Sequence, residues 1–331
     1  MPLANLSAQI VSPRTFELVE SQINSIEEDE VLIEVISCGI CSSEMPIYTG
    51  DLIGTAGVSF RYKEYPAKLG HEVVGTVIDV GKKVTRFKTS DIVTGLTYSG
   101  AGFAKYFVEK ESMLCSINGL SAPEYILGEP LMATINILNN INFELGDTVS
   151  IIGDGFMSLL LISALRHYPL DKVFVFGHHE SKLDIVRSYG FKHVVNSKQK
   201  DPWQYVMDHT KGAGVNVSIE YAGNSDALRL AASITKAKVR SKLVLASAYD
   251  NNMPFSIGNY LQNRAPVIIP AYPNQSKDKL KDLELGIWAY KKNIIEIKSL
   301  ITHEFTLDGL NDAYKYITEN RDKYIKGIVR I

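Results

Sequence analysis

Residues 147–158 read DTVSIIGDGFMS, and this stretch decides the fold of the second half of the chain. Asp147–Ile152 is rich in β-branched residues and predicts a buried strand. Gly153-Asp154-Gly155 predicts a tight turn, and the apolar stretch Phe156–His167 predicts a helix. A strand, a glycine turn and a helix in this order form a site where a helix N-terminus can bind the pyrophosphate of a dinucleotide.

The alternation of strand and helix continues to about residue 270. Further strands are predicted at Lys172–Phe176, His193–Val195, Val215–Glu220, Lys242–Leu245 and Val267–Pro270, with helical segments such as Ser181–Tyr189 between most of them. Strands that alternate with helices predict a parallel, doubly wound sheet of the Rossmann type. We therefore assign residues 134–272 to a dinucleotide-binding domain.

The first 130 residues have a different pattern. Short β segments at Val31–Ile36, Glu72–Val80 and Phe103–Val108 are separated by turn residues, and no long helical pattern interrupts them. After residue 272, an amphipathic helix (Lys279–Lys292) precedes two more strands, Ile301–Phe305 and Lys326–Ile331. A β-rich, barrel-like domain is the expectation for the N-terminal part.

Composition excludes several classes of protein. The chain has 331 residues, which suits two domains, and its net charge of −2 gives no electrostatic case for a nucleic-acid partner. No apolar run has the length of a membrane span, and the N-terminus lacks the basic and apolar regions of a signal peptide. The three cysteines favour a reducing compartment. We expect a cytoplasmic protein without a membrane partner.

Two short motifs in the N-terminal part carry metal-binding residue types. Gly39-Ile-Cys41-Ser-Ser-Glu44 supplies a thiol and a carboxylate, and Gly70-His71-Glu72 supplies an imidazole and a second carboxylate. Thiolate, imidazole and carboxylate ligands suit a catalytic zinc with one open position. The separation is too long for a zinc finger, so the fold would have to bring these ligands together.

With these motifs the chain resembles the zinc-dependent medium-chain dehydrogenases/reductases, the alcohol and polyol dehydrogenases. The glycine spacing after His71 (Gly70, Gly75, Gly81, then Val84) fits the zinc signature of that family, and the resemblance extends over nearly the whole chain. It implies a GroES-like catalytic domain formed by residues 1–133 and 273–331, because the C-terminal tail returns to complete the β-rich domain. It also implies a homodimer or homotetramer.

The resemblance also implies the metal ligands. Cys41 and His71 would bind zinc, and their alternatives are a buried small hydrophobe and a satisfied core histidine. Glu72 and Glu129 compete for the third position; Glu129 lies in a Glu-Pro-Leu segment that resembles sorbitol dehydrogenase-like relatives. Which of the two carboxylates binds in the resting state stays open.

Three further positions near Cys41 are assigned by the same resemblance. Ser43 matches the hydroxyl that contacts the substrate oxygen, and Glu44 matches an acid that supports the ligands from behind or, alternatively, only begins a helix. Pro46 replaces the histidine that relays the proton in simple alcohol dehydrogenases. The proton would then leave through water held by Glu72 or Glu129, so we assign Ser43, Glu72 and Glu129 to catalysis.

The cofactor residues follow from the glycine turn and from the end of the next strand. Gly153, Gly155, Phe156 and Met157 would hold the pyrophosphate, although Ser158 replaces the third glycine. Position 177, where an acid normally binds the NAD ribose, is glycine, and the nearby cationic and polar side chains could surround a 2′-phosphate: His178, His179, Ser181 and Lys182. This predicts NADP; the alternative is NAD served by Glu180 or water. We also assign Gly223 and Lys326 to the cofactor.

The expected activity is hydride transfer between the nicotinamide and a secondary alcohol or ketone, with one catalytic zinc. Three cysteines, one of them assigned to this site, cannot form the four-cysteine structural zinc site of many relatives. The Glu-Pro-Leu segment and the missing structural lobe favour a polyol, sugar or cyclitol derivative as the small-molecule substrate. The alternatives are a zinc-free quinone or enone reductase and a non-catalytic NADP-binding protein.

Overall fold

The computed structural model describes residues 2–51, 64–97, 100–237, 239–249, 253–256, 258–272 and 275–331. The chain forms two compact units. Unit 1 comprises Met1–Met132, Asp278–Lys291 and Ile297–Ile331; unit 2 comprises Ala133–Lys277 and Lys292–Glu296. The boundary predicted after residue 272 falls at residues 273–274, which lie outside the described residues. The predicted boundary at residue 133 falls inside a helix, α2 (Gly128–Ile141).

Unit 1 is rich in β structure. Its strands are β1 (Leu3–Ser12), β2 (Thr15–Ile23), β3 (Glu30–Ile40), β4 (Ala67–Lys68), β5 (Glu72–Val80), β6 (Ile92–Gly95), β7 (Tyr106–Lys110), β8 (Leu114–Ser116), β15 (Ile301–Thr306) and β16 (Lys326–Arg330). Its helices, besides the start of α2, are α1 (Met45–Thr49), α7 (Lys279–Lys291) and α8 (Leu310–Glu319). Of these, the sequence analysis had not predicted the strands β1, β2, β4, β6 and β8 or the helices α1, α2 and α8.

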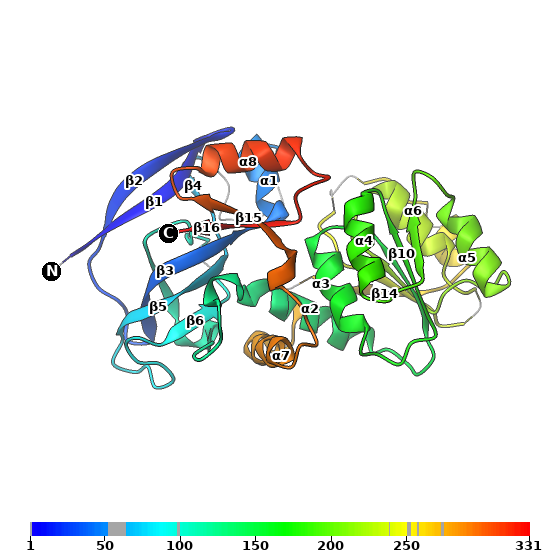
Figure 1. Cartoon of the computed structure of the whole chain (residues 1–331), viewed down its shortest axis with the longest axis horizontal. Helices are drawn as coiled ribbons and strands as arrows, with labels where there is room; N and C mark the ends of the chain where they lie inside the picture. Colours follow the sequence, from blue (N-terminus) through cyan, green and yellow to red (C-terminus); the bar gives the residue numbers. More distant parts are fainter. Residues whose placement is uncertain are drawn as a thin grey trace. The chain divides into compact units, whose positions relative to one another are not determined.

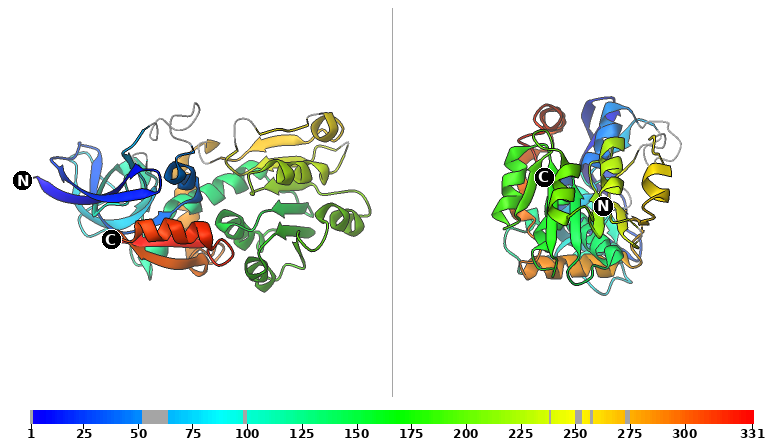
Figure 2. Two further views of the ribbon diagram at one scale, coloured as in Figure 1. Left: turned by 90° about the horizontal axis from the view of Figure 1, so that it is seen from above. Right: turned by 90° about the vertical axis from the view of Figure 1, so that its right-hand side faces the viewer.

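The C-terminal strands complete the β-rich unit, as the sequence analysis expected. Strand β16 pairs antiparallel with β3, and β15 pairs parallel with β16. Figure 2 shows these last segments, drawn in orange and red, beside the blue N-terminal strands. On its other side β3 pairs antiparallel with β5, so β3 is the central strand from which the metal-ligating motifs extend.

Unit 2 is the parallel, doubly wound sheet that the sequence predicts. Its strand order is β11-β10-β9-β12-β13-β14, and every pair of neighbours is parallel. Helices α3 and α4 pack together, as do α5 and α6, and both pairs flank the strands (Figure 1). The strands are β9 (Thr148–Ile152), β10 (Lys172–Gly177), β11 (His193–Asn196), β12 (Val217–Glu220), β13 (Lys242–Leu245) and β14 (Val267–Pro270). The helices are α3 (Phe156–Leu165), α4 (Glu180–Ser188), α5 (Pro202–Thr210) and α6 (Ser225–Ser233).

The core of this sheet explains the apolar sequence of its strands. All five residues of β9 are buried, as expected for a central parallel strand that is covered on both faces. Helix α3 is apolar all round, and eight of its ten residues are buried. No helix among the described residues is both long and apolar enough to cross a membrane.

Candidate metal centre and dinucleotide turn

Strand pairing brings the two metal-ligating motifs together in unit 1. Strand β3 ends at Ile40, one residue before Cys41, and both β5 and β16 run antiparallel to it. The first residue of β5, Glu72, and the first residue of β16, Lys326, therefore lie beside the end of β3. Opposite Glu72 the chain has Gly39, where a Cβ atom would overlap the Glu72 carboxylate. Glycine at this position makes room for a buried acid.

Three of the four predicted ligands form a compact set. One ligand atom each of Cys41, His71 and Glu72 lies within 4.8 Å of the other two. Glu129, in the first turn of α2, does not join this set, although its carboxylate is close enough to Glu72 and His71 to interact electrostatically. A thiol, an imidazole and a carboxylate in this arrangement are a donor set that suits zinc.

Glu44 holds His71 from behind. Its Oε1 lies 2.8 Å from His71 Nδ1 and accepts a hydrogen bond from the backbone N–H of Gly70 at 2.7 Å, and its Oε2 accepts one from the Tyr314 hydroxyl at 2.8 Å. With Nδ1 directed at a carboxylate, Nε2 is the nitrogen left to bind a metal. The structure thus shows Glu44 supporting His71 as expected, and it adds Tyr314, for which no sequence motif provides a signal.

The charges around His71 shift its protonation. Burial alone would lower the pKa of His71, but the Glu44 carboxylate and the Cys41 sulfur outweigh burial and hold the pKa well above its ordinary value. Burial likewise opposes ionisation of Glu44, yet His71 and the hydrogen bonds lower its pKa. A metal at Nε2 must therefore displace a proton from His71.

The buried Lys326 forms an ion pair with Glu72, the carboxylate of the ligand set. Lys326 Nζ lies 2.6 Å from both oxygens of Glu72, and the two side chains are 3% and 1% exposed. The hydrogen bond goes to Oε1, while Oε2 accepts no hydrogen bond of good geometry from the described residues. Burial disfavours the charged lysine, but Glu72 raises the pKa of Lys326 above its ordinary value. The sequence analysis assigned Lys326 to the cofactor; in the structure its partner is Glu72.

Three other residues lie near Cys41 in the chain: Cys38, Ser43 and Pro46. The Ser43 hydroxyl is exposed and donates to Cys41 Sγ at 3.2 Å. Pro46 lies in the first turn of α1, where its missing N–H costs no hydrogen bond. Cys38, the other cysteine nearby, is fully buried, and burial raises the pKa of its thiol. Cys41 is therefore the cysteine of this pair that suits a metal ligand.

In unit 2 the glycine turn has the geometry of a dinucleotide site. Gly153 has φ +122°, where a Cβ would lie 3.1 Å from backbone and side-chain atoms of Tyr221, and Gly155 is the N-cap of α3 without a side-chain cap. Phe156 and Met157 form the first turn of that helix. Ser158, which replaces the third glycine, is buried and donates its hydroxyl to the Gly153 carbonyl at 2.7 Å.

The other predicted cofactor residues lie at the carboxyl ends of neighbouring strands. Gly177 ends β10, followed by an exposed His178 and a partly buried His179. Gly223, after β12, has φ +69° and donates its N–H to Glu220. Lys182, which the sequence analysis placed around a 2′-phosphate, is only 6% exposed and is one of the buried residues of α4. The turn residue Asp154, which the sequence analysis did not assign, contacts His178 and His179.

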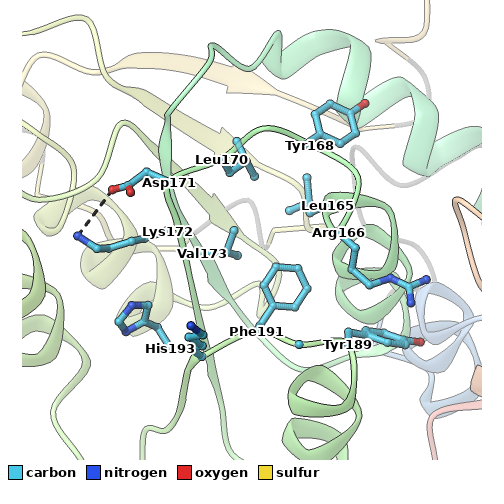
Figure 3. Close-up of a pocket in the computed structure, with 12 residues that line it drawn as sticks. Leu165, Arg166, Tyr168, Leu170, Asp171, Lys172, Val173, Tyr189, Phe191 and His193 are labelled. Atoms are coloured by element: carbon cyan, nitrogen blue, oxygen red, sulfur yellow. Dashed lines mark ion pairs between the residues drawn. The ribbon is translucent and has the colours of Figure 1, made fainter.

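A pocket of about 350 Å³ lies elsewhere on this unit (Figure 3). It is lined by Lys172 and His193, the first residues of β10 and β11, and so opens at the amino ends of the strands. Two of its cations have acidic partners: Arg166 pairs with Glu296, and Lys172 pairs with Asp171. Ligands of doubly wound sheets bind at the opposite, carboxyl ends, so this pocket is not the dinucleotide site.

Comparisons with known proteins cover both units. The description "Alcohol dehydrogenase GroES-like domain" matches residues 27–150, and "Zinc-binding dehydrogenase" matches residues 157–282. The sorbitol dehydrogenase of Bacillus subtilis (strain 168) is 25% identical over 356 residues, which cover 98% of this chain and 97% of that protein. The L-threonine 3-dehydrogenase of Caldanaerobacter subterraneus subsp. tengcongensis is 26% identical over 326 residues, 88% of this chain and 89% of that protein. The crystal structure of galactitol-1-phosphate dehydrogenase from Escherichia coli superposes with a TM-score of 0.84 at 20% identity and covers 98% of this chain and 100% of that one.

Proposed function

Because the chain belongs to the zinc-type medium-chain dehydrogenase/reductase family and is an oxidoreductase, we propose that it transfers hydride between a nicotinamide dinucleotide and a secondary alcohol or ketone with one catalytic zinc. The observation that carries the proposal is the set formed by Cys41, His71 and Glu72, whose ligand atoms lie within 4.8 Å of one another. A quinone or enone reductase without zinc has no need for these three donors.

The donor set fits a divalent cation for two further reasons. Glu72 Oε2 is buried and accepts no hydrogen bond of good geometry from the described residues, so besides its contact with Lys326 Nζ at 2.6 Å it has lone-pair capacity left for a metal ion. Besides the Cys41 thiol, three carboxyl groups lie close together (Glu44, Glu72 and Glu129), with Lys326 and His71 as the cations that act on them. A bound zinc would supply Lewis acidity toward the substrate oxygen.

The chain's own residues would orient the substrate and move its proton. We propose that the Ser43 hydroxyl, now 3.2 Å from Cys41 Sγ, contacts the substrate oxygen. Pro46 has no titratable group, so the proton cannot follow a histidine at that position. Glu72 or Glu129, through water, is the proposed acceptor, and Glu129 is the better candidate because Lys326 already binds Glu72.

The substrate class rests on resemblance. The similarity to a sorbitol dehydrogenase, together with the Glu-Pro-Leu segment at Glu129, supports a polyol, sugar or cyclitol derivative. The similarity to an L-threonine 3-dehydrogenase shows that other secondary alcohols belong in the same screen. The choice between NADP, which Gly177 predicts, and NAD depends on which charged groups lie at the end of β10.

The test is a metal analysis joined to a turnover screen. Purified protein should contain about one zinc per chain and should oxidise at least one polyol, sugar or cyclitol with NAD or NADP. Protein that binds the dinucleotide but takes up no zinc would refute the proposal and favour a zinc-free reductase or a non-catalytic binding protein. Light scattering of the same sample would check the predicted dimer or tetramer.

A further inference from the structure

Asp154, in the middle of the glycine turn, reaches the end of the neighbouring strand. Gly177 is the last residue of β10, and a Cβ atom built there would lie 2.5 Å from Asp154 Oδ2 and 2.8 Å from its Cγ. The Asp154 carboxylate therefore fills the space of the side chain that position 177 lacks. This space is where dinucleotide-binding sheets normally carry the acid that binds the adenosine ribose.

The carboxylate is fixed in this place and is ionised. Asp154 Oδ2 accepts hydrogen bonds from the backbone N–H groups of His178 at 2.7 Å and His179 at 2.8 Å, and His179 Nδ1 lies 3.1 Å from both of its oxygens. Burial alone would raise the pKa of Asp154, but the hydrogen bonds from His179 and His178 lower it below its ordinary value. Its side chain is 11% exposed.

Of the groups that could hold a 2′-phosphate, His178 and Ser181 are exposed, whereas the others are buried or already hydrogen-bonded. Lys182 is buried on the inner face of α4, and the imidazole of His179 is turned toward Asp154. The backbone N–H groups of His178 and His179, which could bind an anion, already donate to the carboxylate. Of the predicted phosphate-binding histidines, only His178 is exposed.

We propose that Asp154 is the residue that determines cofactor choice: its carboxylate accepts the ribose hydroxyls in place of the missing acid at Gly177, and it makes the site prefer NAD(H) to NADP(H). The inference rests on the proposed dinucleotide function. A 2′-phosphate would lie beside the ionised Asp154 carboxylate, and two neighbouring negative charges repel each other. The backbone N–H groups that could bind the phosphate already donate to this carboxylate. Glycine at position 177 then leaves the space that the Asp154 side chain occupies and does not indicate a preference for NADP.

The experiment measures dissociation constants of NADH and NADPH by nicotinamide fluorescence, with the full chain. The wild type should bind NADH about tenfold or more tightly than NADPH, the size of one charge-assisted hydrogen bond. Asp154→Asn should weaken NADH binding by about tenfold and leave NADPH equal or tighter, so that the preference disappears. Gly177→Asp alone is no clean test, because its Cβ would lie 2.5 Å from Asp154 Oδ2.

The double variant Asp154→Gly, Gly177→Asp moves the acid to its usual position and should restore the preference for NADH. Glycine is needed at position 154 because a Cβ at position 177 would also lie 2.7 Å from the Asp154 Cβ. Asp184→Asn is the matched control and should leave the ratio of the two constants within about twofold, because this exposed carboxylate of α4 pairs with Arg187 and has no part in the proposal. A wild type that binds NADPH more tightly, or an Asp154→Asn variant that weakens both nucleotides equally, would overturn the role of Asp154. A folded wild type that binds neither nucleotide would instead refute the proposed function.

Discussion

Each unit contains buried carboxylates, but different kinds of partner hold them. In unit 1, Glu44 and Glu72 are held mainly by the side chains of His71 and Lys326, which lie 27 and 254 residues away in the chain, and Glu44 also accepts one backbone N–H, from Gly70. In unit 2, Asp154 is held mainly by the backbone N–H groups of a loop 24 and 25 residues away. Ion pairs across distant strands make the metal centre dependent on the whole β-rich unit, whereas the dinucleotide turn is secured by one strand–helix–strand segment.

The largest effect should come from the ligand thiol. Cys41→Ser should lower turnover by on the order of 100-fold or more and reduce the zinc content, because a hydroxyl is a poor substitute for a thiolate on zinc. Dinucleotide binding, which belongs to unit 2, should stay within about twofold. Elemental analysis, steady-state kinetics and NADH fluorescence measure the three quantities.

Cys115→Ser is the matched control for this change. Cys115 is a buried thiol in β8 and is not in the metal-ligating set, so its variant should keep the zinc of the wild type. Full activity and full zinc in Cys41→Ser would show that the ligand assignment is wrong.

The next effect concerns the buried ion pair of unit 1. In metal-free protein, Lys326→Met should lower the free energy of unfolding by about 3–5 kcal/mol, because the Glu72 carboxylate would stay buried without its cation. The double variant with Glu72→Gln should recover much of this loss, as the uncompensated charge is then absent. Denaturant unfolding of the three proteins provides the comparison.

Adding zinc to the same proteins tests whether Glu72 binds the metal. If Glu72 is a zinc ligand, saturating zinc should stabilise Lys326→Met more than it stabilises the wild type, since the ion replaces the missing cation. Equal stabilisation of both proteins would argue that Glu72 does not bind the metal.

A smaller and pH-dependent effect is expected at Glu129. Burial raises the pKa of this carboxyl to about 7, against the lowering influence of His71. A group with this pKa accepts protons above about pH 7 and is protonated below it, so alcohol oxidation through Glu129 should rise as the pH increases through that value. A bound cation would move the inflection to lower pH.

Glu129→Gln should therefore lower alcohol oxidation by about tenfold and remove the inflection, with cofactor binding little changed. The pH–rate profile of the variant is the measurement, with Glu72→Gln beside it. If both variants keep the profile of the wild type, neither carboxylate is the proton acceptor, and Glu129 is only a helix-terminal acid beside Pro130.

Much of the fold was predictable because its signals are local. The strands β5, β13 and β14 have the predicted bounds, since an apolar run between turn residues marks each of them. Helix α2 was missed because it begins inside the segment read as β-rich and continues through the predicted boundary. The strands β1 and β2 were missed because both leave many residues at least partly exposed, which weakens the apolar pattern.

The site was predictable only as far as residue types and spacing carry information. Cys41, His71 and Glu72 stand in motifs, and the pairing of β3 with β5 brings them together. The partnership of Lys326 with Glu72 has no local signal, because it depends on the antiparallel pairing of β16 with β3. A sequence signal for Asp154 does exist: an acid lies between the two glycines of the turn, and position 177, whose side-chain space this acid occupies, is a glycine.

The smallest effect tests how locally the dinucleotide turn is secured. Ser158 Oγ donates to the Gly153 carbonyl at 2.7 Å, which ties the first turn of α3 to the residue that follows β9. Ser158→Ala should lower the free energy of unfolding by about 1 kcal/mol, the usual net value of one hydrogen bond, and should weaken NADH binding slightly. Ser188→Ala is the matched control, because its hydroxyl makes the same kind of bond, to the Ile185 carbonyl at 2.7 Å, on an exposed helix end. Denaturant unfolding should show a change within about 0.5 kcal/mol for the control. A loss within about 0.5 kcal/mol in Ser158→Ala as well would mean that the turn needs no help from Ser158, and that backbone geometry at Gly153 and Gly155 alone secures it.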